Sequence, residues 1–334
     1  MTERRKRFGV TGKSAECRNG IPTEHAYSAE SIRFGSLPDG LRRRIEAPTI
    51  GPGTERHPSE GCESLQKETT PVRPPAILYD AYIFDLDGTV YLGEELLPSA
   101  GETIAVLRNV GKRTVFLSNN PTHTREAYSA KLGRLGVSTP ASDIITSSQV
   151  MVSFLRHTLP AARLFVIGEQ PLQDELLSAG FELVVDASLT DAVIASFDRT
   201  FAYQKLQIAF DAIRLGAQFF ATNGDRFCPV PGGGEPDAAS IIAAVEACTN
   251  TKVEAIVGKP SPHTAAAVLG LLDMPPDECL MTGDRLETDV LMGLNAGIPV
   301  ALTLTGATSY ADYVASPIIP TYAIERLSDL IPSP

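Results

Sequence analysis

The 334-residue chain carries 29 Lys and Arg against 40 Asp and Glu, and its five cysteines are widely scattered. One hydrophobic core rarely serves a chain of this length, so we expect two domains, or one domain with a disordered segment. The acidic balance argues against nucleic-acid and anionic-lipid partners, and the odd cysteine count without a CxxC pair argues against a disulfide framework or a thiolate zinc site.

Residues 1–75 differ from the rest of the chain in composition. They hold 8 Gly, 8 Pro and 13 Lys and Arg against 10 Asp and Glu, which leaves 16 basic against 30 acidic residues beyond them. Without sustained apolar periodicity, this segment is predicted to be a disordered extension. Its basic clusters fit either an acidic partner or a solvated tail. The sequence shows neither a signal peptide nor a membrane span, so we expect a cytoplasmic protein.

Strands and helices alternate from residue 77 onward. In residues 76–160 the pattern predicts strands at 81–85, 113–117 and 143–146, and helices at 98–111, 124–135 and 148–157. A strand, a helix and a second strand at this spacing form a βαβ unit with parallel strands.

A second alternating series occupies residues 161–250. It predicts strands at 164–167, 182–185, 192–196 and 218–221, and helices at 171–179, 203–215 and 237–248. A long loop is expected at 222–236, where three consecutive glycines would let the backbone approach a ligand closely. A flexible connector is the alternative reading of this loop.

The last part, residues 251–334, returns to the first pattern. It predicts strands at 254–257, 279–282 and 300–304, with helices at 262–272 and through residue 294. The whole chain from residue 76 is therefore predicted to be an α/β protein built on parallel sheet.

Two carboxylates, Asp85 and Asp87, end the first predicted strand in the stretch AYIFDLDGTV. Side chains two residues apart in an extended segment share a face, so both acids can approach one reacting centre. Two carboxylates at about 4 Å repel by about 4 kcal/mol at an effective dielectric near 20, so a proton or a cation must share the site. An ordinary solvated turn is the alternative reading.

Further polar residues follow other predicted strands: Ser118, Lys259, Asp284 and Asp289. Since the carboxyl ends of parallel strands meet at one sheet edge, we expect them to lie near Asp85 and Asp87. An all-oxygen ligand set of this kind suits Mg²⁺, whereas the scattered histidines do not suit zinc.

These motifs resemble those of the haloacid dehalogenase superfamily, in the branch of p-nitrophenyl phosphatase and of the N-acetylglucosamine-operon and arabinose-operon sugar-phosphate phosphatases. The resemblance covers residues 77–334 and rests on DLDGT at 85–89, VFLSNN at 115–120, VGKPSP at 257–262 and GDRLETD at 283–289, in the family's order. It implies a Rossmann-like core in two parts, 76–160 and 251–334, with an α/β cap inserted at 161–250.

The resemblance also implies the roles of individual residues. Asp85 would be the nucleophile, and Asp87 the general acid and base. Ser118, with Asn119 beside it, and Lys259 would hold phosphate. Mg²⁺ would be bound by four residues: Asp85, the backbone carbonyl of Asp87, Asp284 and Asp289.

Residues Asp225 and Arg226 in the cap loop are predicted to face the leaving group. Here ATNGD at 221–225 resembles the family's ATNPD, with Gly224 in place of Pro. The expected substrate is a small phosphorylated metabolite: a sugar phosphate, p-nitrophenyl phosphate or phosphoglycolate. The resemblance also allows a homodimer through the cap.

Two other classes of function remain open at this point. One is a catalytically idle regulatory or small-molecule-binding protein on the same fold, which the presence of Asp85, Asp87, Lys259 and Asp284 disfavours. The other is a Rossmann dehydrogenase, which the lack of a G-x-G-x-x-G sequence after a strand disfavours.

Overall fold

The computed structural model describes residues 72–230 and 233–332, all within a compact unit that spans Gln66–Pro334. Most of the predicted disordered extension, residues 1–71, lies outside the described residues. The described end of that segment contacts the folded part, because the backbone N–H and C=O of Arg73 pair with Ala323 at 2.8 and 3.2 Å. No helix in the described ranges is long and apolar enough to cross a membrane.

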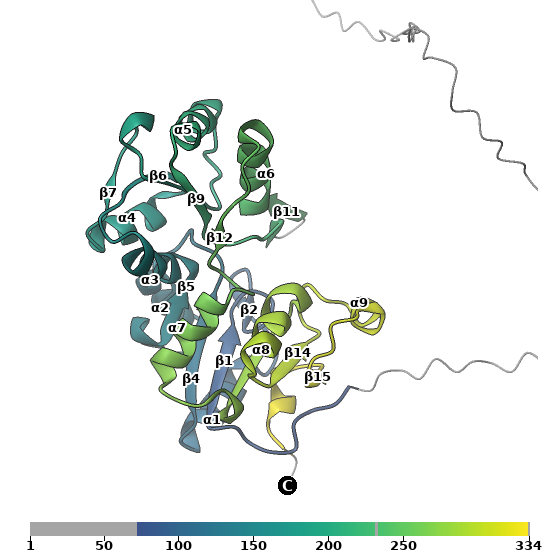
Figure 1. The fold of residues 1–334 in the computed structure, drawn as a ribbon. Helices are drawn as coiled ribbons and strands as arrows, with labels where there is room; N and C mark the ends of the chain where they lie inside the picture. The colour runs from purple at the N-terminus through teal and green to yellow at the C-terminus, as the bar shows by residue number, and fades with distance from the viewer. Residues whose placement is uncertain (1–71, 231–232, 333–334) are drawn as a thin grey trace, which may run out of the picture. The chain divides into compact units, whose positions relative to one another are not determined.

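A six-stranded parallel sheet carries the first and last parts of the chain (Figure 1). Its strands, in spatial order, are β15 (Tyr322–Ile324), β14 (Val300–Thr303), β13 (Cys279–Gly283), β1 (Ala81–Asp85), β4 (Arg113–Ser118) and β5 (Ile144–Thr146). All five neighbouring pairs run parallel. The prediction of an α/β fold with a parallel core is therefore confirmed, although β15 was not predicted.

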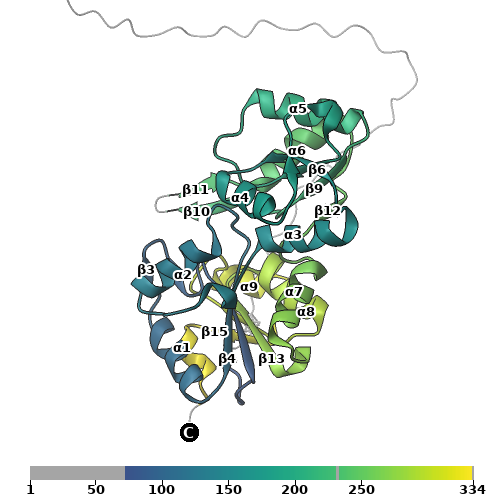
Figure 2. The ribbon, with the colours of Figure 1, turned by 90° about the vertical axis from the view of Figure 1, so that its left-hand side faces the viewer.

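Helices cover both faces of this sheet, as Figure 2 shows. Side chains alternate along β1, so Tyr82 and Phe84 pack on one side, and Ala81 and Ile83 on the other. The first face is covered by α1 (Ala100–Asn109) and α2 (Arg125–Arg134). The second is covered by α3 (Ser147–Thr158), α7 (Pro262–Leu272) and α8 (Leu291–Ala296), while α9 (Tyr310–Ala315) follows later in the chain.

The middle of the chain forms a second parallel sheet, which we call the insert together with its helices. Its strands, in spatial order, are β12 (Ala255–Ile256), β9 (Gln218–Ala221), β8 (Ala192–Ala195), β6 (Arg163–Ile167) and β7 (Glu182–Leu183). The helices are α4 (Gln170–Ser178), α5 (Tyr203–Arg214) and α6 (Ala238–Thr249). Apolar residues of α5 and α6 pack against β6, β8 and β9.

Two antiparallel hairpins were not predicted. One joins β2 (Tyr91–Leu92) to β3 (Glu95–Leu96), directly after the DLDGT motif. The other joins β10 (Phe227–Val230) to β11 (Gly233–Pro236), within the segment expected to be a loop. The prediction of one long loop over 222–236 was therefore wrong, because Phe227 pairs with Pro236 and Cys228 with Glu235 in a regular ladder.

Candidate active site

Three carboxylates meet at the carboxyl edge of the six-stranded sheet. Asp85 ends β1, Asp284 follows β13, and Asp289 lies in the π-helical turn Leu286–Val290. One ligand oxygen from each lies within 4.8 Å of the others, and all three residues are buried. The Nζ atom of Lys259 lies 2.5 Å from Asp85 Oδ1 and 2.6 Å from Asp289 Oδ1. The ammonium group therefore balances part of the charge of a buried acidic cluster.

The cluster fits a divalent cation. Asp284 accepts a hydrogen bond from the Ala307 N–H through Oδ2, but its buried Oδ1 has no hydrogen-bond partner among the described residues. Burial and then the Asp289 charge raise the pKa of Asp284 to about 6, and burial raises the pKa of Asp85 well above its usual range despite the opposing effect of Lys259. Carboxylate oxygens so placed are the ligands that hard cations prefer.

Two glycines of the motifs lie against these carboxylates. Gly88 has a φ of 88°, and a Cβ there would come within 2.5 Å of Asp284 Oδ2. A Cβ at Gly283 would lie 2.3 Å from Asp289 Cγ. The close approach of the acids therefore requires glycine at both positions, and the positive φ of Gly88 favours it there a second time.

Lys259 reaches the site by a route that the sequence did not predict. The strand before it, β12, pairs with β9 of the insert rather than with the core sheet. The Val257 and Gly258 N–H groups extend this pairing by donating to Ala221 and Thr222. The expectation that Lys259 follows a strand of the core sheet was therefore wrong, although its side chain does reach Asp85.

Asn119 fixes the backbone of Lys259 to the end of β4. Its Oδ1 accepts from the Lys259 N–H at 2.8 Å, and its Nδ2 donates to the Lys259 carbonyl at 3.2 Å. The same Nδ2 donates to Asp225 Oδ2 at 2.9 Å. Asn119 thus connects a strand end of the core to Lys259 and to the insert.

Ser118 lies at the end of β4, and its buried Oγ lies 3.1 Å from the Tyr128 hydroxyl. The Oγ atom also accepts from the Asn120 N–H at 3.2 Å. These contacts orient the hydroxyl, and Ser118 lines the same cavity as Asp85 and Lys259.

Asp87 is half-buried and lines the cavity beside Asp85. Its backbone bridges to Tyr91 in the hairpin that follows. Burial raises the pKa of Asp87, and the positive charges of Lys131 and His123 partly oppose that rise. A carboxyl group with a raised pKa can carry a proton at a pH where an ordinary aspartate is ionised.

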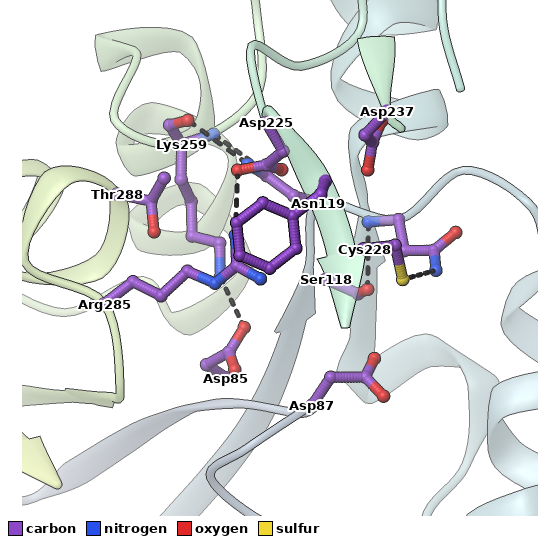
Figure 3. Close-up of a pocket in the computed structure, with 12 residues that line it drawn as sticks. Asp85, Asp87, Ser118, Asn119, Asp225, Cys228, Asp237, Lys259, Arg285 and Thr288 are labelled. Carbon is purple, nitrogen blue, oxygen red and sulfur yellow. Dashed lines mark hydrogen bonds and ion pairs between the residues drawn. The ribbon is translucent and has the colours of Figure 1, made fainter. Parts of the chain in front are cut away.

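The cavity encloses about 430 Å³ not filled by protein atoms, part of it open to solvent. Figure 3 shows Asp85 and Asp87 across it from Asp225 and Asp237. The residues that line it are Asp85, Asp87, Ser118, Asn119, Asn120, Asp225, Phe227, Cys228, Asp237, Lys259, Arg285 and Thr288.

Of the two residues predicted from the cap loop, the structure places only Asp225 in this cavity. Arg226 is exposed and lines an adjacent cleft, which shares Asp225, Phe227, Arg285 and Thr288 with the cavity. The arginine that does line the cavity is Arg285, whose Nη1 lies 3.5 Å from Asp225 Oδ1 and whose guanidinium lies 5.8 Å from the Phe227 ring centre.

Sequence reasoning also missed Asp237, Phe227 and Cys228. A signal existed for Arg285, which lies inside GDRLETD, and for Asp237, which begins a predicted helix. For Phe227 and Cys228 the sequence offered none, because the pairing of β10 with β11 brings them to the cavity.

Comparisons with known proteins agree with this geometry. Residues 82–182 match the model of a family described as haloacid dehalogenase-like hydrolase, and residues 256–330 match one described as HAD-hydrolase-like. The chain is 37% identical to the sugar-phosphatase AraL of Bacillus subtilis over 266 residues. This alignment covers 80% of this chain and 95% of that protein. An acid sugar phosphatase of Staphylococcus epidermidis is 32% identical over 250 residues, covering 75% and 96%.

Solved structures show the same likeness. The 4-nitrophenylphosphatase of Thermotoga maritima superposes with a TM-score of 0.72 at 35% identity and covers 75% of this chain and 96% of that one. The p-nitrophenyl phosphatase of Archaeoglobus fulgidus superposes with a TM-score of 0.72 at 28% identity and covers 76% and 98%.

Proposed function

Because this chain belongs to the haloacid dehalogenase-like hydrolases and is a phosphatase, we propose that it hydrolyses small phosphomonoesters through an aspartyl-phosphate on Asp85. The observation that carries the proposal is the position of Lys259 between the buried Asp85 and Asp289, which form an acidic cluster with Asp284. An idle regulatory role has no support in this geometry or in the relatives.

Asp85 is the nucleophile of the proposed reaction. One carboxylate oxygen attacks phosphorus in line with the ester bond, the new O–P bond forms, and the ester oxygen leaves with its bonding electrons. Lys259 stays charged, because the carboxylates of Asp289 and Asp85 raise its pKa against the opposing effect of burial. Its ammonium group therefore counters the negative charge of both the nucleophile and the phosphoryl group.

Asp87 moves the protons. In the first step it donates a proton to the departing alkoxide, and in the second it accepts one from the water that attacks the aspartyl-phosphate. Inorganic phosphate leaves, and Asp85 returns to its starting state. The raised pKa of Asp87 supports this role, because the first step needs a protonated carboxyl group.

Ser118 and Lys259 hold the phosphoryl oxygens, and Asn119 positions Lys259. The Ser118 hydroxyl donates a hydrogen bond to the phosphoryl group and accepts one from the Asn120 N–H. The two bonds between Asn119 and the Lys259 backbone keep the ammonium group directed at Asp85.

The acidic cluster would hold Mg²⁺ through Asp85, Asp284, Asp289 and the backbone carbonyl of Asp87. When bound, the ion would lower the repulsion between the Asp85 carboxylate and the phosphate dianion. Removing divalent ions with EDTA is expected to abolish turnover, and added Mg²⁺ to restore it. Full activity in excess EDTA would contradict the metal assignment.

The substrates fall among sugar phosphates, p-nitrophenyl phosphate and phosphoglycolate. Core residues hold only the phosphoryl group, which all these esters share, so the insert must discriminate among their leaving groups. Sugar phosphates receive support from the two curated relatives, which are named as sugar phosphatases.

Release of inorganic phosphate from p-nitrophenyl phosphate tests the proposal. We expect Mg²⁺-dependent turnover that is lost in Asp85→Asn, because an amide is not a nucleophile. A matched Asp211→Asn variant, which changes an exposed carboxylate on α5, should keep wild-type turnover. Wild-type activity in Asp85→Asn would refute the mechanism.

We also propose a homodimer formed through the cap. Large apolar side chains are exposed on the insert, including Val185, Tyr203 and Leu215, which are 78%, 79% and 68% exposed. Light scattering on the purified chain tests this assembly, and a monomer that persists at high concentration would contradict it.

A further inference from the structure

Two carboxylates of the insert, Asp225 and Asp237, form a wall of the cavity that the proposed reaction does not use. The Nδ2 atom of Asn223 donates to Asp225 Oδ2 at 3.1 Å and to Asp237 Oδ1 at 3.0 Å. Both oxygens contact one nitrogen, so the two carboxylates lie close together. Figure 3 shows this pair facing Asp85 and Asp87 from the opposite side of the cavity.

Asp237 has a capping role that accounts for only one of its oxygens. Oδ1 accepts the Ala238 N–H at the start of α6 as well as the Asn223 amide. For Oδ2, no hydrogen bond is found within the part of the chain that the structure describes. The side chain lines the cavity, so this oxygen is available to a hydrogen-bond donor of a bound molecule.

The balance of charge on this wall is negative. Among the described residues that line the cavity, the cations are Lys259 and Arg285. Lys259 contacts Asp85 and Asp289 on the phosphoryl side. Arg285 lies 3.5 Å from Asp225 and so offsets one of the two wall carboxylates. The wall that faces the leaving group therefore keeps one carboxylate, Asp237, that forms an ion pair with neither of these described cations.

We propose that Asp225 and Asp237 determine specificity by favouring leaving groups that donate hydrogen bonds and carry no negative charge, and by rejecting those with a carboxylate or a second phosphate. Hydroxyl and ammonium groups satisfy the carboxylate oxygens, whereas an anion would be repelled in a partly desolvated cavity. This inference rests on the proposed phosphatase reaction and narrows its preferred substrates to polyol and amine esters, which excludes phosphoglycolate.

The buried position of Asp237 does not remove its charge near neutral pH. Burial raises the pKa of Asp237 to about 6, although its hydrogen bonds with Ala238 and Asn223 act in the opposite direction. The carboxylate is therefore largely ionised at pH 7.5, the pH chosen for the substrate assays.

Three esters of equal length separate charge from size: phosphoethanolamine, 2-hydroxyethyl phosphate and 2-phosphoglycolate. Each is measured as a substrate and as a competitor of p-nitrophenyl phosphate hydrolysis, so even a slowly hydrolysed ester can be ranked. We expect 2-phosphoglycolate to be at least about tenfold poorer than the other two by kcat/KM or by inhibition constant.

The wall carboxylates are then changed to amides of the same shape in Asp225→Asn, Asp237→Asn and the double variant. Asn also caps helices well, so α6 keeps its first turn. The double variant is expected to bring the charged and neutral esters to within about threefold of each other, whereas Asp211→Asn should leave the ratio unchanged. A ratio within one enzyme preparation does not change when part of the protein is misfolded.

Two results would overturn the inference. One is a wild-type enzyme that uses or binds 2-phosphoglycolate as well as 2-hydroxyethyl phosphate. The other is a double variant that keeps the wild-type ratio. Hydrolysis of p-nitrophenyl phosphate separates this failure from that of the proposed function, because the wall can be misassigned in an enzyme that still releases p-nitrophenol.

Discussion

Replacing Lys259 by Met tests whether this buried cation holds the acidic cluster together. The side chain is 3% exposed and contacts Asp85 and Asp289 at 2.5 and 2.6 Å, so its loss leaves buried carboxylates without their counter-ion. Removing one partner of a buried ion pair lowers the free energy of unfolding by about 3–5 kcal/mol. For a domain of this size, that corresponds to a fall in Tm of roughly 6 to 20 °C.

The assay is thermal unfolding in EDTA and again with added Mg²⁺. In EDTA the variant should unfold well below the wild type, and Mg²⁺ should raise its Tm by more than it raises that of the wild type, since a bound cation then replaces the lost charge. The control is Lys112→Met, which removes a partly exposed pair with Asp80 at 2.7 Å and should cost less than about 1 kcal/mol. If Lys259→Met keeps its Tm within 2 °C or so of the wild type in EDTA, the charge argument is refuted.

Three further predictions follow from particular residues. In Asp87→Asn, Mg²⁺ binding measured by calorimetry should persist, since the backbone carbonyl remains, while turnover of alkyl phosphates falls at least about a hundredfold; equal turnover would remove Asp87 from the reaction. Because the pKa of Asp237 is raised to about 6, the stability that its protonation contributes is complete below about pH 4 and is lost as the pH rises through 6; the Tm of Asp237→Asn relative to wild type should rise across that window and then level off, and a constant difference would contradict this assignment. Deleting residues 1–71 should leave kcat unchanged. Deleting residues 1–75 should lower Tm relative to the 1–71 deletion, because Arg73 pairs with Ala323; equal Tm values for the two deletions would show that this bridge adds no stability.

Local sequence was sufficient to predict the strands that end at the site. The apolar run before Asp85 and the run before Asp284 are each followed at once by an acid and a turn. Parallel pairing then brings the two strand ends together, since β1 and β13 are neighbours. The acidic cluster could therefore be predicted without knowing any distance.

The sheet that β12 joins could not be predicted in the same way. Strands buried on both faces read as apolar runs in either sheet, so residues 254–257 suit both. The choice depends on pairing with β9, which lies more than thirty residues earlier in the chain.

The arginine at the cavity was mispredicted for a related reason. Arg226 and Arg285 each follow an aspartate, and only the folded chain shows that Arg285 contacts Asp225 while Arg226 is exposed. The hairpin of Phe227 and Cys228 was hidden because glycines and prolines interrupt the period-two pattern of its strands.

The most direct test of the account is to detect the phosphoryl group on Asp85. p-Nitrophenolate leaves without needing a proton, so Asp87→Asn should still be phosphorylated by p-nitrophenyl phosphate, while slow hydrolysis lets the intermediate accumulate. After acid quenching, peptide mass spectrometry is expected to find one phosphoryl group on the peptide that contains Asp85. The double variant Asp85→Asn, Asp87→Asn is expected to carry none. The proposed mechanism would be contradicted if the Asp87→Asn variant hydrolyses p-nitrophenyl phosphate but shows no such adduct. It would also be contradicted if the double variant, which lacks Asp85, still shows the adduct.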